Sequence, residues 1–170
     1  MSAQSREILR RRFIASAGLT ATVVCLVPYR VFGAEENLVT ASRKAGETAN
    51  ITVQALRGNI SALIGSGGNI AVLPGGDGKL IIDSGFLGTR SKIADALSNL
   101  SPDPIKHLVN TRWHFDHTDG NEWMYSAGAV ITTAHENTKK HLTTSTRAED
   151  WNFTFPASPA GPDSNRSVHD

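Results

Sequence analysis

The most concentrated set of reactive side chains in this chain lies in one short segment, residues 110–121, which reads NTRWHFDHTDGN. It holds two histidines and an aspartate within four positions: His114, Asp116 and His117. Imidazole nitrogen and carboxylate oxygen are ligands of zinc and other borderline divalent cations. The spacing also fits a polar surface loop with two unrelated histidines, because two histidines three residues apart are weak evidence of a metal site.

The elements that must position this segment are indicated by the hydrophobic pattern upstream of it. Apolar and β-branched residues gather in short runs that are divided by turn clusters rich in glycine, a pattern typical of an antiparallel meander. We predict four strands there, at residues 51–55, 59–64, 69–73 and 79–83. The period then changes to that of a helix over residues 89–100, with Thr89 as its N-cap and Pro102 ending it.

The rest of the chain alternates strand and helix patterns. A short apolar strand at residues 105–109 leads into the reactive segment, which we predict to be a loop that lets side chains converge on one point. Further predicted elements are a helix at 122–127, a strand at 129–132, a helix at 136–142 and a last strand through Trp151, Phe153 and Phe155. This order predicts a layered α/β domain.

Two flanking segments lack a clear period. Residues 34–50 are polar, and we interpret them as a linker or frayed segment. Residues 156–170 consist mainly of Pro, Ser, Gly, Asp and Asn, which predicts a disordered tail.

The amino terminus has the pattern of an export signal. Arg10-Arg11-Arg12-Phe13-Ile14 is typical of the twin-arginine motif, and an uncharged, mostly apolar run extends from Phe13 to Tyr29. Val31-Phe32-Gly33 then offers a cleavage site. We predict a removable signal over residues 1–33 and a periplasmic location. The alternative is an uncleaved membrane anchor, since 17 apolar residues are at the short limit of a membrane span.

Charge and composition exclude several classes of protein. Residues 1–33 hold five arginines against Glu7, whereas the remainder holds twelve basic and fifteen acidic residues. A mildly acidic domain argues against a nucleic-acid partner, because such binding depends on neutralising phosphates. The single cysteine excludes an intramolecular disulfide and a zinc site built from several cysteines. The sequence leaves the oligomeric state open.

The reactive segment resembles the signature His-x-His-x-Asp-His of the metallo-β-lactamase-fold hydrolases, in which it follows a strand. His114, Asp116 and His117 match the second, third and fourth defined positions of that signature. Upstream, Ile82-Asp83-Ser84-Gly85 is similar to the strand of that family that ends in Asp-x-Gly. The resemblance covers residues 51–155. It implies the α/β fold of the family, an αβ/βα sandwich, present here as its first half only.

The resemblance also implies a function. It implies a hydrolase that binds one or two zinc ions and acts on a small molecule whose class the sequence does not indicate. His114, Asp116 and His117 would be metal ligands, and Asp116 would also orient or deprotonate the attacking water. Asp83 would orient ligands through hydrogen bonds. The alternative for Asp83 is a structural role in the turn that follows its strand.

Two departures from the family pattern weaken the inference of an active zinc hydrolase. Arg112 stands where the signature has its first histidine, and a guanidinium has no lone pair to give a metal. The ligands of the family's second half also have no match, because we predict His135, His141 and His169 to be surface residues. The alternatives are therefore an inactive remnant, or a module that binds an anion through Arg112.

Overall fold

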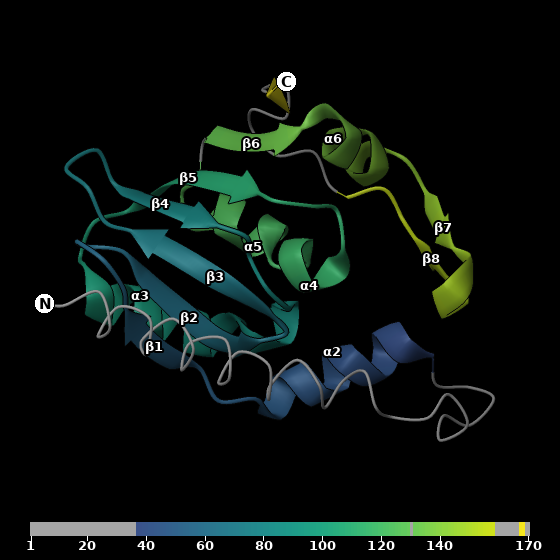
Figure 1. Ribbon diagram of the computed structural model, residues 1–170, viewed down its shortest axis with the longest axis horizontal. Coiled ribbons are helices and arrows are strands. Elements are labelled where there is room, and N and C mark those ends of the chain that lie inside the picture. The colour runs from purple at the N-terminus through teal and green to yellow at the C-terminus, as the bar shows by residue number, and fades with distance from the viewer. Residues whose placement is uncertain (1–36, 130, 159–166, 169–170) are drawn as a thin grey trace, which may run out of the picture. The chain divides into compact units, whose positions relative to one another are not determined.

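The centre of the fold is a mixed β-sheet. The computed structural model describes residues 37–129, 131–158 and 167–168. Within these residues the sheet has seven strands, in the order β1-β2-β3-β4-β5-β6-β9 (Figure 1). The strands are β1 (Thr52–Ala55), β2 (Ser61–Ser66), β3 (Gly68–Leu73), β4 (Lys79–Ile82), β5 (Ile105–Asn110), β6 (Ile131–His135) and β9 (Ser167–Val168).

The connections between strands follow from their directions. Strands β1 to β4 pair antiparallel through short turns, which confirms the predicted meander. Strands β4, β5, β6 and β9 pair parallel. Parallel neighbours need crossover connections, and one helix supplies each of the first two. Helix α3 (Arg90–Leu100) joins β4 to β5, and helix α5 (Asn121–Ser126) joins β5 to β6, close to the predicted ranges.

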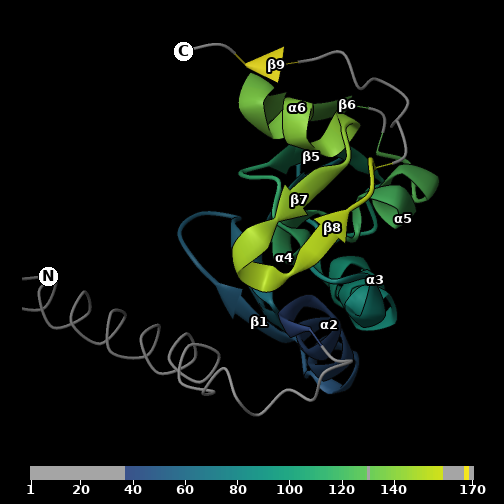
Figure 2. The ribbon, with the colours of Figure 1, turned by 90° about the vertical axis from the view of Figure 1, so that its right-hand side faces the viewer.

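Helices α3 and α5 lie on the same side of the sheet (Figure 2). Burial alternates along the strands, as in β3, because successive side chains point to opposite faces. The main core lies between this face of the sheet and the helices. It consists of Leu63, Ile70, Val72, Ile81, Ile93, Ala96, Leu97, Ile105, Leu108, Trp123, Met124 and Ala129. The other face is only half-buried at positions such as Ala71, Leu80 and Ile82.

The predicted linker is wrong for most of its length, because residues 38–48 form helix α2 (Leu38–Thr48). Asn37 caps this helix by accepting a hydrogen bond from the Thr40 amide at 3.0 Å. Only Val39 and Gly46 are buried on it, so its apolar stripe is too sparse to show a helical period. Gly46 allows close contact with Phe86: a Cβ at this position would lie 2.5 Å from the ring.

The carboxyl-terminal part also differs from expectation. Helix α6 (Glu136–Thr143) is as predicted, but the single strand expected through Trp151 is a hairpin of β7 (Thr146–Ala148) and β8 (Phe153–Phe155). Between these strands, η2 (Glu149–Trp151) and Asn152, with φ of 47°, make the turn. Ser167–Val168 pair with β6, so the predicted tail contains a strand.

The remaining predictions for the ends of the chain lie outside the described residues. They are the signal at residues 1–33 and the tail at residues 159–166 and 169–170. Among the helices that the structure describes, none has the length and apolar character needed to cross a membrane.

Candidate functional site

The reactive segment lies where two parallel strands end. Asp83 follows β4, and Thr111 follows β5, the neighbouring parallel strand. The carboxyl ends of parallel strands form a crevice where loops can bring side chains together. The predicted loop contains a short helix, α4 (Phe115–Thr118), and a 3-10 turn, η1 (Leu87–Thr89), follows the Asp83 turn.

A buried polar network fixes the segment to the strand ends. The backbone carbonyl of His117 accepts hydrogen bonds from the Ser84 amide at 2.9 Å, from Ser84 Oγ at 3.1 Å and from Asn110 Nδ2 at 3.3 Å. Asn121 completes the network by exchanging side-chain hydrogen bonds with Asn110 at 2.9 and 3.1 Å. On the other side, Gly68 lets the segment approach β3, because a Cβ there would lie 2.8 Å from the Asp116 carbonyl.

Asp83 occupies a strained backbone position and is fully engaged in hydrogen bonds. Its φ is 64°, in the left-handed region of backbone conformation that residues other than glycine rarely adopt. Its carboxylate accepts hydrogen bonds from the Thr111 amide at 2.8 Å and from Thr111 Oγ1 at 2.7 Å. It also contacts His117 Nδ1 at 2.7 Å. This contact is the one that an orienting role for Asp83 requires.

His117 is held between two carboxylates. Its Nδ1 lies 2.7 Å from Asp83, its Nε2 lies 3.0 Å from Asp116 Oδ2, and its side chain is only 7% exposed. Burial alone would lower the pKa of His117, but hydrogen bonds to Asp116 and Asp83, together with their charges, raise it to about 9. Without a metal, the imidazole is therefore protonated at neutral pH and donates from both nitrogens.

Of the two carboxylates that contact His117, that of Asp116 is partly exposed. Burial opposes ionisation of its carboxyl group, but the hydrogen bond from His117 and the His117 charge outweigh burial and lower the pKa of Asp116. Arg112, which is exposed beside the site, lowers the pKa of Asp116 further. The carboxylate is thus ionised at neutral pH, and its negative charge favours a cation.

The third predicted ligand, His114, has different neighbours. Its ring makes edge contacts with Trp113, at 4.8 Å between ring centres, and with Trp151 of the β7–β8 hairpin, at 5.1 Å. Burial lowers the pKa of His114, and the nearby Asp116 charge offsets this only in part. Within the ranges that the structure describes, no three His, Cys, Asp or Glu side chains form a group that could hold a metal ion. The structure thus joins Asp116 to His117, whereas the ring of His114 contacts Trp113 and Trp151.

The other histidines are placed as follows. His135 ends β6 at the same edge of the sheet, and its Nδ1 accepts a hydrogen bond from the Asn137 amide at 3.1 Å to cap α6. His141 is half-buried and stacks on Trp113 at 4.8 Å, so the expectation of a simple surface residue is wrong for it. His169 lies outside the described residues.

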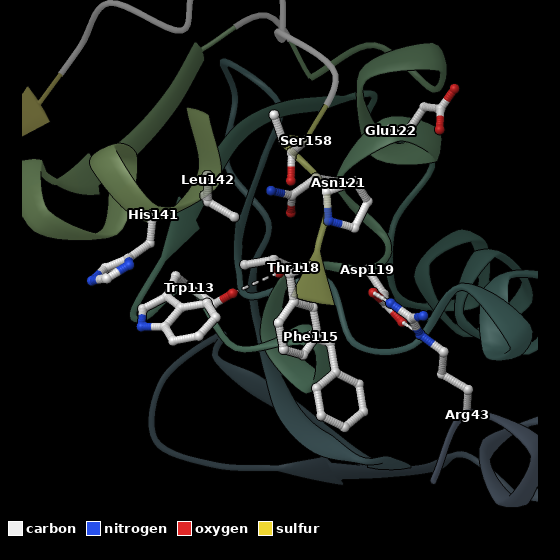
Figure 3. A pocket seen from close by; sticks show the side chains of 13 residues that line it. Arg43, Trp113, Phe115, Thr118, Asp119, Asn121, Glu122, His141, Leu142 and Ser158 are labelled. Atoms are coloured by element: carbon white, nitrogen blue, oxygen red, sulfur yellow. Dashed lines mark hydrogen bonds and ion pairs between the residues drawn. The ribbon is translucent and has the colours of Figure 1, made fainter. Parts of the chain in front are cut away.

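A pocket lies against the same segment but does not involve the predicted ligands. Its volume is about 170 Å³, and Figure 3 shows the side chains around it. Its lining residues are Arg43, Trp113, Phe115, Thr118, Asp119, Asn121, Glu122, His141, Leu142, Phe155, Pro156, Ala157 and Ser158. Trp113 and Phe115, which alternate with the predicted ligands, line the pocket, whereas His114, Asp116 and His117 do not.

An ion pair that sequence reasoning missed borders this pocket. Arg43 of α2 donates two hydrogen bonds of 2.7 Å to the carboxylate of Asp119 (Figure 3). Its guanidinium also lies 5.6 Å from the ring centres of Phe115 and Phe153. The pair joins α2 to the reactive segment. No signal in the sequence links residues 76 positions apart, and α2 itself was not predicted.

The fold and this site define a family. The family model described as the metallo-beta-lactamase superfamily matches residues 63–169, and the chain belongs to that superfamily. This confirms the predicted family, and it extends the domain beyond residue 155. A comparison with curated proteins found no match.

Solved structures of subclass B3 metallo-beta-lactamases are similar to this chain. One, described as the first of its subclass with an active-site glutamic acid, is 23% identical at a TM-score of 0.59, over 78% of this chain and 50% of its own. MEM-A1, from a soil metagenome library, is 21% identical at a TM-score of 0.60, over 73% and 48%. BJP-1 of Bradyrhizobium japonicum is 26% identical at a TM-score of 0.58, over 75% and 48%. The chain thus spans about half the length of these proteins, as the predicted first half of the sandwich would.

Proposed function

We propose that this chain is a metal-dependent hydrolase of the superfamily, with Asp116 and His117 as the protein ligands of a zinc ion. The observation that carries the proposal is the arrangement around His117. Asp83 engages its Nδ1, while its Nε2 and the Asp116 carboxylate lie 3.0 Å apart and face one another. Zinc-binding histidines in proteins have the same partners, with a carboxylate on the ring nitrogen that does not bind the metal.

The donors present fit only part of a zinc site. Catalytic zinc sites usually have three protein ligands and an open position. Here two donors converge, His114 lies between Trp113 and Trp151, and Arg112 brings a positive charge close by. Zinc would therefore bind weakly, held by Asp116 and His117 alone. When bound, zinc supplies a water whose pKa is near neutrality.

The side chains around the ion have separate tasks in this proposal. Asp116 is ionised, so it accepts a proton or orients a water molecule by hydrogen bonding. Asp83 keeps the His117 ring in place and selects its tautomer. The substrate is a small molecule, and its class stays open.

The proposal is tested by zinc-dependent hydrolysis. Asp116→Asn should abolish any zinc-dependent hydrolysis of a chromogenic β-lactam and lower zinc binding in calorimetry, because the amide keeps the shape of the side chain but loses its charge. Asp95→Asn, the same substitution on the exposed face of α3, serves as the matched control and should change neither. Zinc-dependent hydrolysis that survives undiminished in the Asp116 variant would contradict the proposed site.

A second candidate is a module that binds an anion through Arg112. It is favoured by the exposure of Arg112 beside the site and by the lack of a three-donor group in the described part of the chain. The zinc-free chain would then bind inorganic phosphate, and Arg112→Gln would remove this binding. Phosphate binding that survives the substitution would exclude this candidate.

Export to the periplasm is part of the proposal and rests on residues 10–14. We expect that replacing Arg10, Arg11 and Arg12 by Lys will retain the precursor in the cytoplasm, because the twin-arginine motif is read by a receptor. Cell fractionation and immunoblotting of the native and variant chains measure this. Undiminished mature protein in the periplasm of the variant would refute the twin-arginine route, and membrane-bound precursor would indicate an uncleaved anchor.

A further inference from the structure

The first strand of the sheet has an open edge. Among the described strands, β1 stands at one end of the sheet order and pairs only with β2. All four of its residues are exposed. A strand at a sheet edge presents backbone amides and carbonyls that another strand can pair with.

The register shows which backbone groups point outward. The Leu56 amide donates to the Ile60 carbonyl at 2.8 Å, and the same register pairs Gln54 with Ala62. In an antiparallel ladder, hydrogen-bonded pairs alternate with pairs that do not exchange hydrogen bonds. Gln54 therefore bonds toward β2, whereas the amides and carbonyls of Val53 and Ala55 point away from the sheet.

Apart from the short length of β1, four residues, this edge lacks the usual protection against pairing. Natural edge strands are very short, or carry lysine, proline, inward charges or bulges that block a second strand. Residues 50–56 contain no charged residue and no proline, and the β1–β2 register has no bulge. Instead, exposed apolar side chains gather here: Val53, Leu56 and Ile60 are 43%, 45% and 37% exposed. They are three of the four large apolar side chains that are exposed among the described residues.

We propose that β1 is an interface at which two copies of this chain associate edge to edge. Two β1 strands that pair antiparallel about a twofold axis offer each other the same donors and acceptors, from Val53 and Ala55. Such an interface is closed, so it produces a dimer and not a fibre. A second copy fits better than a charged partner, because the edge has no charge to select one. The contact is short, so the dimer should be weak.

The test is sedimentation velocity of the full chain over a range of concentrations. The native chain should show a reversible monomer–dimer equilibrium. Val53→Pro removes the outward amide and leaves the β1–β2 hydrogen bonds intact, since proline is tolerated on an edge. Each of the two copies carries the substitution, so the dimer loses two hydrogen bonds. Its dissociation constant should therefore rise by roughly tenfold to hundredfold. A native chain that stays monomeric, or a Val53→Pro dimer of native strength, would overturn the proposal.

Two further measurements separate the edge from other contacts. Val53→Lys should weaken the dimer as proline does, whereas Leu87→Lys, which adds the same charge at the exposed apolar residue outside this hairpin, should leave it unchanged. Hydrogen exchange at the amides of Val53 and Ala55 should slow as the concentration of the native chain rises. Exchange at these amides that does not depend on concentration would place the dimer contact elsewhere and refute the proposal.

Discussion

The metal-free chain should lose about 3 kcal/mol of its free energy of unfolding between pH 6.5 and pH 9. The cause is His117, whose pKa is raised from 6.5 to about 9 in the folded chain. Burial opposes the charged ring, but Asp116 and Asp83 stabilise it more strongly. Because the folded pKa lies above the unfolded one, this stabilisation is complete below pH 6.5 and disappears as the pH rises through 9.

Urea unfolding in the presence of a chelator, repeated across this pH range, measures the effect. Asp83→Asn removes the carboxylate from His117 Nδ1, so the pH dependence of unfolding should become smaller and the fold less stable. The control is again Asp95→Asn, which removes an exposed carboxylate far from His117 in the sequence and should keep the native pH dependence. A native chain whose stability is flat from pH 6.5 to pH 9 would show that the two carboxylates do not hold a protonated ring.

Arg112→His should raise the affinity for zinc by roughly a hundredfold or more. The substitution exchanges a fixed positive charge near the ion for a neutral nitrogen donor. At a separation of a few ångströms, repulsion between like charges in a partly solvated site amounts to a few kcal/mol. Each 1.4 kcal/mol changes the dissociation constant about tenfold. A third donor would also bring the site closer to the usual coordination of catalytic zinc.

Zinc titration by calorimetry on three chains separates these two causes. Arg112→Ala removes the charge without adding a donor, so its affinity should lie between those of the native chain and Arg112→His. If the affinity of the alanine variant equals that of Arg112→His, charge alone explains the gain. Tight, stoichiometric zinc in the native chain, unaltered by alanine at Asp116 and His117, would contradict the whole description of the site.

The sequence alone determined the features that depend on local pattern. The meander and helices α3, α5 and α6 were predictable because their apolar residues repeat with the period of a strand or a helix. The family, and the importance of residues 110–121, followed from one short motif. Asp83 was identified in the same way, from its position at the end of a strand. These signals lie within a few residues of one another along the chain.

Only the tertiary structure decided which of these residues meet. It paired His117 with both Asp83 and Asp116, and it placed His114 against Trp151 of a hairpin that was not predicted. It also turned the expected linker into α2, whose Arg43 reaches Asp119 across 76 positions. A helix with one buried apolar side chain has no period to detect, and a contact between distant residues leaves no local pattern, because packing against the rest of the fold stabilises both.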